Sequence, residues 1–431
     1  MLLHANRAKQ ETIRHLAVPE SSMNSSFRLF LILTFIIIGR PQDFLVFLAP
    51  FRIALVFTLL TLGATLINGR IRISVLRKYR EVRLYELFYA VMIITIPFAI
   101  FKSQAFTFVF MQYSARVIFF YLLIMHTDSL FRLKKVMSTL VWSTLFYGLL
   151  VILLGSGTEE RVAYGSVFDP NDLAYYMVSL FPIALFFWDS KERLMVRLRT
   201  AATFFTAVLL TLMTQSRGGF VSLAAVMGLI VITPTSGIKK EHRIFIVAGM
   251  LIALVFLGGR INMERIQSIG QIGTDYNLTD EFGRFAIWQR GVRITLQNPL
   301  TGVGANNFAM AIGEQRQAEG ILPRWQAPHN AYLQVVSETG FIGLYIFMAL
   351  IIKTYKNLRR QIPPDPAVPQ LADLKRAMQL IKIAFIGNLC GAFFLSQSYS
   401  VLFPLFFGLS VVSQRIEGQL AAETKIDKVR A

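Results

Sequence analysis

Residues 136–154 read VMSTLVWSTLFYGLLVILL, an unbroken apolar run that follows Arg132, Lys134 and Lys135. The hydrocarbon core of a bilayer is crossed by about 20 apolar residues in one helix, so this run predicts a membrane-spanning helix with basic residues before it. Similar runs recur through the 431-residue chain, which is 54% hydrophobic and 13% aromatic. This composition is typical of an all-α protein that crosses the membrane many times.

About twelve such runs are expected to span the membrane. They cover residues 27–47, 51–68, 84–101, 105–126, 136–154, 173–188, 199–214, 218–233, 244–258, 331–352, 379–395 and 398–414. The motif Arg40-Pro41-Gln42-Asp43 interrupts the first run and could split it into two half-helices, because proline breaks helical hydrogen bonding.

Basic residues cluster before the first predicted helix and after every even-numbered one. Cytoplasmic loops carry the excess of Lys and Arg, so both termini are expected in the cytoplasm, at residues 1–26 and 415–431. The net charge of +19 then reflects this orientation signal and contact with anionic membrane lipids, which argues against nucleic-acid binding.

The N-terminal segment and the single cysteine offer no candidate catalytic or metal site. The first 26 residues are polar, lack a signal-peptide pattern and are expected to be a disordered tail, with Met23 as an alternative start. The single cysteine, Cys390, lies inside a predicted helix, which excludes an intrachain disulfide and a cysteine metal site.

Residues 259–328, between predicted helices 1–9 and 10–12, form the longest segment expected outside the membrane. About 70 residues are too many for a simple connector. Within it, residues 280–298 predict an amphipathic helix that ends at Asn298-Pro299. Arg284 and Trp288 share one face of that helix. Gly302-Val303-Gly304 predicts a turn and lacks the context of a dinucleotide site.

Two further motifs place a charged or titratable side chain where a predicted membrane helix meets water. His329-Asn330 is followed by nine residues, Gly340, two residues and Gly343, and no other histidine of the five has such a position. Arg217, in Gln215-Ser216-Arg217-Gly218-Gly219, stands between two apolar runs, where an arginine is costly unless it snorkels or has a function. Arg116, near the middle of the fourth predicted helix, could pair with a carboxylate or face a lipid phosphate, and it is a possible substrate contact.

These motifs resemble those of the O-antigen ligase and polymerase superfamily of bacterial envelope glycosyltransferases. The likeness rests on the arginine turn, on Arg284 to Trp288 followed by residues 298–304, and on the His329 signature. Phe168-Asp169-Pro170-Asn171-Asp172 also looks like a family element. The resemblance is strongest from about residue 165 to about 350.

The resemblance implies an inverting, metal-independent glycan transfer without a cofactor at the periplasmic face of the inner membrane. The donor would be an undecaprenyl diphosphate-linked oligo- or polysaccharide. The acceptor would be lipid A core in a ligase of lipopolysaccharide biosynthesis, a second carrier-linked glycan in a polymerase, or a Ser or Thr in a protein ligase. We favour the ligase, with the polymerase next.

Under this hypothesis Arg217 and Arg284 bind the diphosphate, because a guanidinium bonds two phosphate oxygens at once. His329 is the candidate base for the acceptor hydroxyl. His329 could instead bond the diphosphate or cap the next helix, and Glu338 is the alternative base. Arg284 could instead pair with Asp280 or Glu281.

Other polar residues have functional or structural interpretations. Trp288 could stack on a sugar or pack within the loop, and Asn330 is a candidate substrate contact. Asp169 and Asp172 are expected to order a turn and cap a helix. A further set could line an anionic groove or be solvated: Arg290, Arg293, Arg316 and Arg324.

A small-solute transporter is the alternative from another class. Such proteins often have repeated halves with broken helices, and the chain contains no such repeat. Use of a nucleotide sugar is not expected, because the chain has neither a phosphate-binding glycine loop nor a cytoplasmic carboxylate pair.

Overall fold

The computed structural model describes residues 23–68, 76–155, 169–189, 192–233, 280, 283–363 and 368–430. Every regular element in these ranges is a helix, so the predicted all-α class is confirmed there. The helices are α2 (Ser25–Gly39), α3 (Pro41–Phe44), α4 (Ile53–Ile67), α6 (Arg80–Ile94), α7 (Lys102–Thr107), α8 (Ser114–His126), α9 (Leu130–Leu154), α10 (Pro170–Ala184), α11 (Leu194–Met213), α12 (Arg217–Ile232), α16 (Arg284–Gln297), α17 (Phe308–Ala318), α18 (Ala331–Leu358), α19 (Gln370–Ala392) and α20 (Leu402–Arg430).

Five helical segments in the described ranges are long and apolar enough to cross a membrane. They are Phe47–Ile67, Lys102–His126, Leu130–Leu154, Leu194–Met213 and Ala331–Leu358, and Ser25–Gly39 and Arg217–Ile232 are apolar but shorter. The length and apolar composition of these helices therefore support a membrane protein. The number of twelve spans stays a prediction, and the ninth, at 244–258, lies outside the described residues, as do residues 259–279, 281 and 282 of the predicted 259–328 loop.

Several helices extend beyond the apolar runs that predicted them. Helix α9 begins at Leu130, six residues before the predicted span, because Ser129 caps it and Arg132 pairs with Asp128 at 3.0 Å. The guanidinium of Arg132 also lies 4.9 Å from the ring of Phe27. Paired cations can thus occupy the first turns of a helix without ending it.

The predicted break in the first span is confirmed. Helix α2 ends at Gly39, Arg40 takes a left-handed φ of 47°, and Pro41 starts the short helix α3. The guanidinium of Arg40 bonds the carboxylate of Asp43 at 2.6 Å. Proline is suited to this first helical position, since its missing N–H would have no partner there.

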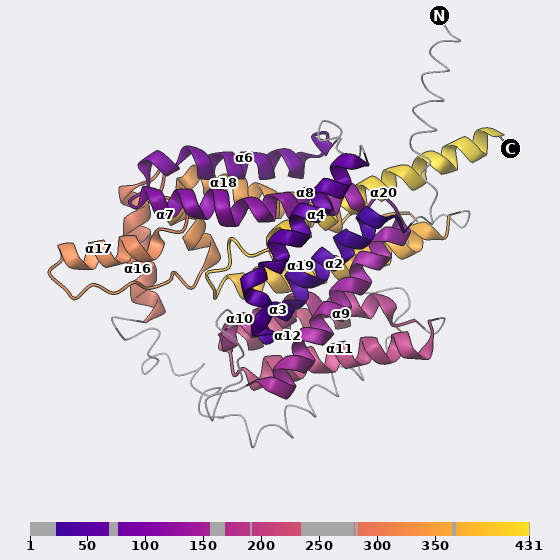
Figure 1. Ribbon diagram of the computed structural model, residues 1–431, viewed down its shortest axis with the longest axis horizontal. Coiled ribbons are helices and arrows are strands. Elements are labelled where there is room, and N and C mark those ends of the chain that lie inside the picture. Colours follow the sequence, from indigo (N-terminus) through magenta and orange to yellow (C-terminus); the bar gives the residue numbers. More distant parts are fainter. Residues whose placement is uncertain are drawn as a thin grey trace, which may run out of the picture.

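Helix α10 lies in the centre of the bundle. Residues 173–184 are all buried, and α9, α11, α12 and α19 pack around the helix (Figure 1). A helix that is apolar on every side is stable only when neighbours surround it. The first turn of α10 is therefore held at a fixed place.

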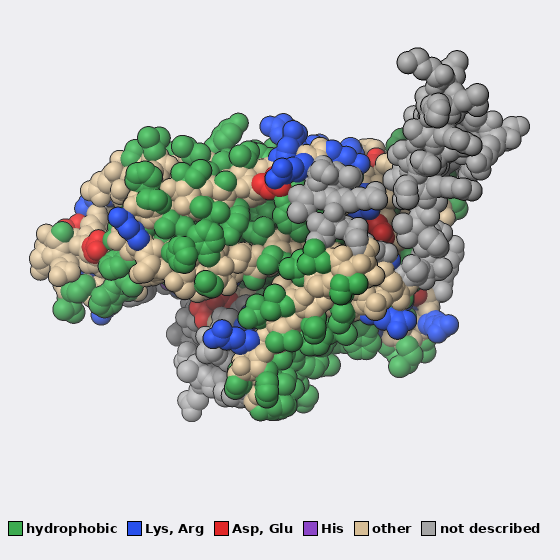
Figure 2. Space-filling view, turned by 45° about the horizontal axis from the view of Figure 1, so that its top comes forward, with side chains coloured by type: hydrophobic (Ala, Val, Ile, Leu, Met, Phe, Trp, Pro, Cys, Tyr) green, Lys and Arg blue, Asp and Glu red, His purple; other side chains and the backbone are tan. Residues whose placement is uncertain are grey.

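Helix α4 shows the opposite arrangement. Its leucines point outward, with Leu59 57% exposed, whereas Thr58, Thr61 and Thr65 are buried. Each threonine hydroxyl donates to the backbone oxygen four residues earlier, so no buried hydroxyl is left unsatisfied. Figure 2 shows hydrophobic side chains across much of the visible face. Such a surface suits lipid better than water.

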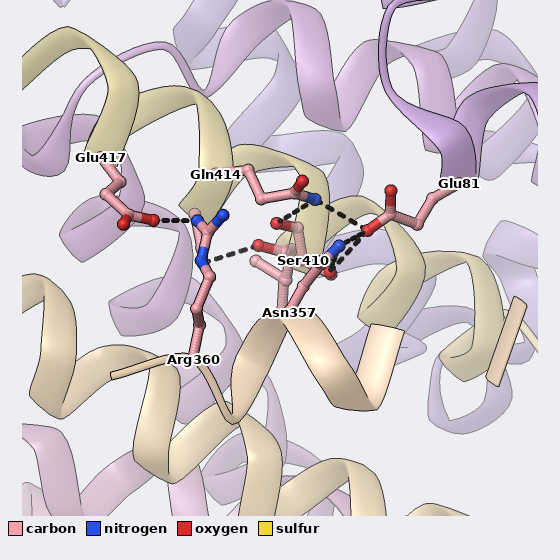
Figure 3. A network of polar contacts seen from close by, with 8 residues as sticks. Glu81, Asn357, Arg360, Ser410, Gln414 and Glu417 are labelled. Carbon is pink, nitrogen blue, oxygen red and sulfur yellow. Dashed lines mark hydrogen bonds and ion pairs between the residues drawn. The ribbon is translucent and has the colours of Figure 1, made fainter. Parts of the chain in front are cut away.

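A buried polar cluster joins α6, α18 and α20 (Figure 3). The carboxylate of Glu81 accepts hydrogen bonds from Asn357, from Ser410 at 3.1 Å and from Gln414 at 2.7 Å. The ion pair Arg360–Glu417 lies beside it. This cluster is at the end where α20 extends past the bundle, opposite to α16 and α17.

Candidate functional site

Helix α18 is broken at Gly340, and a loop fills the break. Gly340 has φ 69° and ψ −176°, which interrupts the helical hydrogen bonds. Loop atoms replace them: Val303 N–H donates to Ser337 O at 2.9 Å, Gly304 N–H to Glu338 O at 3.0 Å, and Phe341 N–H to Pro299 O at 2.8 Å. The predicted turn at 302–304 and the glycines of the His329 signature thus form one structural unit.

Only glycine fits at this break. A Cβ at Gly340 would lie 2.3 Å from the backbone oxygen of Leu300, and one at Gly302 would lie 2.4 Å from the carbonyl carbon of Glu338. A left-handed φ at both positions adds to the cost of any other residue. The close approach fixes the loop, and with it the start of α17, against α18.

Glu338 is buried beneath this loop. Its carboxylate accepts the backbone N–H of Asn306 at 2.7 Å and of Phe308 at 3.2 Å. These contacts order the start of α17 and favour a structural role. Its part as an alternative base stays a prediction.

The backbone around His329 is held from three sides. Asn330 caps α18, since its Oδ1 accepts the N–H of Tyr332 and of Leu333, each at 2.9 Å. The alternative that His329 is the cap is therefore wrong. His329 has a left-handed φ of 46°, and its N–H donates to Ser396 Oγ at 2.9 Å. Such a conformation is uncommon outside glycine and is often found at functional sites.

Trp288 joins α16 to the residue before His329. Its Nε1–H donates to the backbone oxygen of Pro328 at 2.9 Å, and its ring meets Phe393 edge-on with centroids 5.8 Å apart. Gly291 lets α16 approach α18, because a Cβ there would lie 2.9 Å from Leu333 Cδ2. Helix α16 therefore folds back onto the start of α18 and carries Arg284 with it.

The glycines of the arginine turn are explained by packing. Ser216 caps α12 by accepting the N–H of Gly219 at 3.2 Å. A Cβ at Gly218 would lie 2.8 Å from Phe394 Cβ, and one at Gly219 would lie 2.6 Å from Ala174 Cβ. The start of α12 thus touches both α10 and the end of α19, with Arg217 as its first residue.

These elements enclose a narrow pocket of about 10 Å³, roughly the space of one water molecule. Arg284 contributes from α16, while Asn171 and Tyr175 come from α10. The remaining lining residues are Ser216, Gly218 and Gly219 of α12 and Gly391, Phe394 and Leu395 at the end of α19. The first turns of α10, α12 and α16, where helices carry partial positive charge, therefore meet at this pocket together with the end of α19.

The charge around His329 favours its neutral form. Burial lowers the pKa of its imidazole below the usual value, and the positive charge of Arg284 lowers the pKa further. The carboxylate of Asp169 opposes both effects. Asp169, Arg284 and His329 are thus close enough to interact, although they come from three separate parts of the chain.

Asp169 and Asp172 have the predicted structural roles. Asp169 Oδ1 accepts the N–H of Asn171 at 2.7 Å and of Asp172 at 2.8 Å, which caps α10. Asp172 Oδ1 accepts the side-chain amide of Gln397 at 2.8 Å. The first turn of α10 is thereby tied to the segment that holds His329 through Ser396.

Other arginines of the predicted loop lie in separate contacts. Arg290 and Arg293 both bond the carboxylate of Glu319, at 2.7 and 3.0 Å. Arg316 is buried and donates to the backbone oxygen of Leu322 at 3.0 Å. These contacts favour structural and surface roles over an anionic groove. Of the two alternative partners of Arg284, Asp280 is described and Glu281 lies outside the described residues.

Arg116 lies on α8 next to a π-helical segment, Phe108–Tyr113. It donates to the backbone oxygen of Gln112 at 2.8 Å and lies about 6 Å from the rings of Phe108 and Tyr113. It is not among the residues that line the pocket. Its predicted contact with substrate stays a prediction.

The segment between α19 and α20 was missed as part of the site. Ser396 and Gln397 hold His329 and Asp172, and Tyr175 and Phe394 line the pocket. The polar run Ser396-Gln397-Ser398 between two apolar runs was the available signal. In the described ranges, no group of three His, Cys, Asp or Glu side chains could hold a metal ion.

Comparison with known proteins gives two sequence matches. A family model described as O-antigen ligase matches residues 202–348. The matched segment is thus similar to the O-antigen ligase-like superfamily. It contains Arg217, Arg284 and His329, so all three site candidates lie in the matched part.

A curated relative adds a second match. The exopolysaccharide production protein ExoQ of Rhizobium meliloti (strain 1021) is 28% identical over 170 residues, which cover 36% of this chain. The match spans 37% of the length of that relative. Both matches cover only part of this chain.

Proposed function

We propose that the chain is an O-antigen ligase-like glycosyltransferase that moves a glycan from an undecaprenyl diphosphate carrier to an acceptor sugar. One observation carries the proposal. Arg284 and the N-termini of α10 and α12 meet at one pocket, with the partly buried imidazole of His329 beside them. Positive groups and a neutral base therefore stand at one place.

The diphosphate of the donor binds at the mouth of the pocket, because the interior holds little more than one water molecule. Its charge grows as the glycosidic bond breaks, and fixed positive groups stabilise that charge. Arg284 supplies a guanidinium, and backbone N–H groups at helix starts add further donors. Arg217, the first residue of α12, is not among the residues that line the pocket, and in this proposal it binds the diphosphate from beside them.

The reaction transfers one proton and one glycan. The acceptor hydroxyl attacks the anomeric carbon from the side opposite to the diphosphate, which inverts the configuration. The bond between that carbon and the diphosphate oxygen breaks, and undecaprenyl diphosphate leaves. Neutral His329 accepts the hydroxyl proton, as its lowered pKa permits at ambient pH. This scheme requires no metal ion or cofactor.

The layout also suits a lipid-linked donor. We place the site at the periplasmic face of the bacterial inner membrane, with both termini in the cytoplasm. Helices α16 and α17 lie at one end of the bundle, and α20 extends at the other (Figure 1). A donor could then keep its tail in the bilayer while its head reaches Arg284.

The acceptor separates two candidate reactions. A ligase would attach the glycan to lipid A core, and the family description of the matched segment favours this reaction. A polymerase would join two carrier-linked glycans, and the similarity to an exopolysaccharide production protein is the support for that reaction.

Transfer from purified undecaprenyl diphosphate-linked glycan to lipid A core, or to a second donor molecule, tests the proposal. We expect product with one acceptor, and a loss of about 10²–10⁴-fold in rate for His329→Ala, the range for a general base. Arg217→Ala should also lose transfer. Folded variants that remain as active as the unchanged chain would refute these assignments.

A further inference from the structure

An apolar groove lies between α2 and α9, on the outer surface of the bundle. Its volume is about 500 Å³, within the range of about 300–1,000 Å³ that is typical of pockets for small ligands. Ile32 is 44% exposed in it and Trp142 51%. Its other lining residues include Phe35, Thr139, Phe146 and Leu149.

The groove offers almost no polar contact along its length. Thr139 is its polar lining residue, and its hydroxyl already donates to the backbone oxygen of Lys135 at 3.1 Å. The rings of Phe35 and Phe146 lie 5.1 Å apart. Such a lining fits a hydrocarbon chain and offers few hydrogen-bond partners to a sugar or a peptide.

Positive charge gathers at one end of the groove. Helices α2 and α9 run in the same direction, since Phe27 meets Arg132 near their starts and Phe44, just after α2, meets Tyr147 further along α9. Arg28 lies one turn before Ile32, on the same face of α2. Lys135 lies one turn before Thr139 on α9, and both cations are exposed.

A third cation borders the same groove from α11. The guanidinium of Arg199 donates to Ser138 Oγ at 2.8 Å and lies 5.4 Å from the ring of Trp142. Trp142 itself lines the groove. The cations thus stand at the end where α2, α9 and α11 begin.

We propose that this groove binds an anionic phospholipid, with an acyl chain between α2 and α9 and the phosphate at Arg28 and Lys135. The charge pattern decides between the possible occupants. The carrier lipid would place its diphosphate near Arg284, a residue that the groove lacks. A second copy of the chain would gain nothing from cations at one end, whereas the headgroup of a phospholipid matches them.

Native mass spectrometry of the chain, extracted from vesicles with equal phosphatidylglycerol and phosphatidylcholine, tests the proposal. We expect phosphatidylglycerol to be retained in preference. Arg28→Gln with Lys135→Gln should reduce that preference by about five-fold for each cation removed. Thr139→Phe, which fills the groove and leaves the cations, should reduce binding of both lipids.

Arg83→Gln is the matched control, because Arg83 is also exposed but belongs to α6. It should retain the preference of the unchanged chain. Equal retention of the two lipids by the unchanged chain would overturn the proposal. So would a preference that persists in the double variant, or displacement of phosphatidylglycerol by undecaprenyl phosphate. All variants are compared as monodisperse protein, so that misfolding cannot imitate a loss of lipid.

Discussion

At the scale of single residues, the arrangement of His329 is set by its neighbours rather than by its own side chain. Ser396 holds its backbone N–H, Asn330 caps the helix that follows, and Trp288 holds the residue before it. The strained φ of 46° is maintained by these contacts. A base in such a setting keeps one orientation without reorganisation at the moment of reaction.

Asp169→Asn isolates the electrostatic part of this setting. Asparagine caps a helix as well as aspartate does, so α10 should keep its start while the negative charge near His329 is lost. Because that charge raises the pKa of His329, we expect the imidazole pKa to fall further below its usual value of about 6.5. NMR titration of ring-labelled histidine measures it.

The same variant should change the pH dependence of transfer. The neutral imidazole is the active form, so the rate is lost as pH falls through the pKa of His329. A lower pKa moves this acid limb to lower pH. An acid limb that stays in place or moves to higher pH would show that His329 is not the group that titrates.

Trp288→Phe tests whether the indole N–H positions the site. Phenylalanine keeps an aromatic ring that can contact Phe393, but the hydrogen bond to Pro328 is lost. A net loss of about 1 kcal/mol per hydrogen bond corresponds to about a five-fold slower transfer.

The matched control is Trp325→Phe, at a tryptophan that is 64% exposed. It should leave the rate unchanged. Similar rates for the two variants would contradict a positioning role for Trp288.

The residues of the site were predictable where their type is costly in a membrane. Arg217 and His329 are charged or titratable side chains at the ends of apolar runs, and Arg284 lies on one face of a predicted amphipathic helix, which made them visible in the sequence. Ser396 and Phe394 were not, because small polar and aromatic residues occur at such places in many proteins. Their contribution depends on contacts between segments far apart in the chain.

At the scale of elements, the break in α18 and the loop at 298–304 depend on each other. The spacing from His329 to Gly340 and Gly343 was evident, and so was the turn at Gly302-Val303-Gly304. That the loop fills the break at Gly340 was not evident, because neither motif indicates which other segment of the chain it contacts. The helices themselves follow from the apolar runs, with ends that differ where caps and ion pairs extend them.

Gly340→Ala should destabilise the protein. The new Cβ would meet the backbone oxygen of Leu300 at 2.3 Å, and the left-handed φ adds a strain of about 1–3 kcal/mol. We expect a lower melting temperature in detergent and weaker transfer, since the start of α18 carries His329.

Gly228→Ala is the control, because a Cβ there meets nothing within 4 Å. Alanine in an open helix position is more favourable than glycine, so stability should stay or rise. Equal melting temperatures for the two variants would contradict the close packing at Gly340.

At the scale of the whole molecule, different kinds of contact stabilise the two ends of the bundle. Around the site, backbone hydrogen bonds and glycine contacts join α10, α12, α16 and α18. At the other end, the cluster of Glu81, Asn357, Ser410 and Gln414 joins α6, α18 and α20 (Figure 3). Composition predicted that helices would assemble, but it could not predict which polar groups would hold them.

Glu81→Leu should lower the melting temperature, because buried donors of Asn357 and Gln414 would lose their acceptor at about 1–3 kcal/mol each. Glu81→Gln places an amide oxygen where the carboxylate oxygen was, so an acceptor is kept and the variant should be tolerated far better. Equal losses for the two variants would show that the cluster stabilises the bundle by some other means.

The most direct test of the central claim compares two arginines of α16 in a single-turnover transfer from undecaprenyl diphosphate-linked glycan. Arg284 lines the pocket, whereas Arg293 bonds Glu319 on the exposed side. We predict that Arg284→Gln slows transfer by about 10²–10³-fold, as loss of one group that stabilises developing charge does, while Arg293→Gln leaves it unchanged. Equal rates for the two variants would contradict a diphosphate site at Arg284.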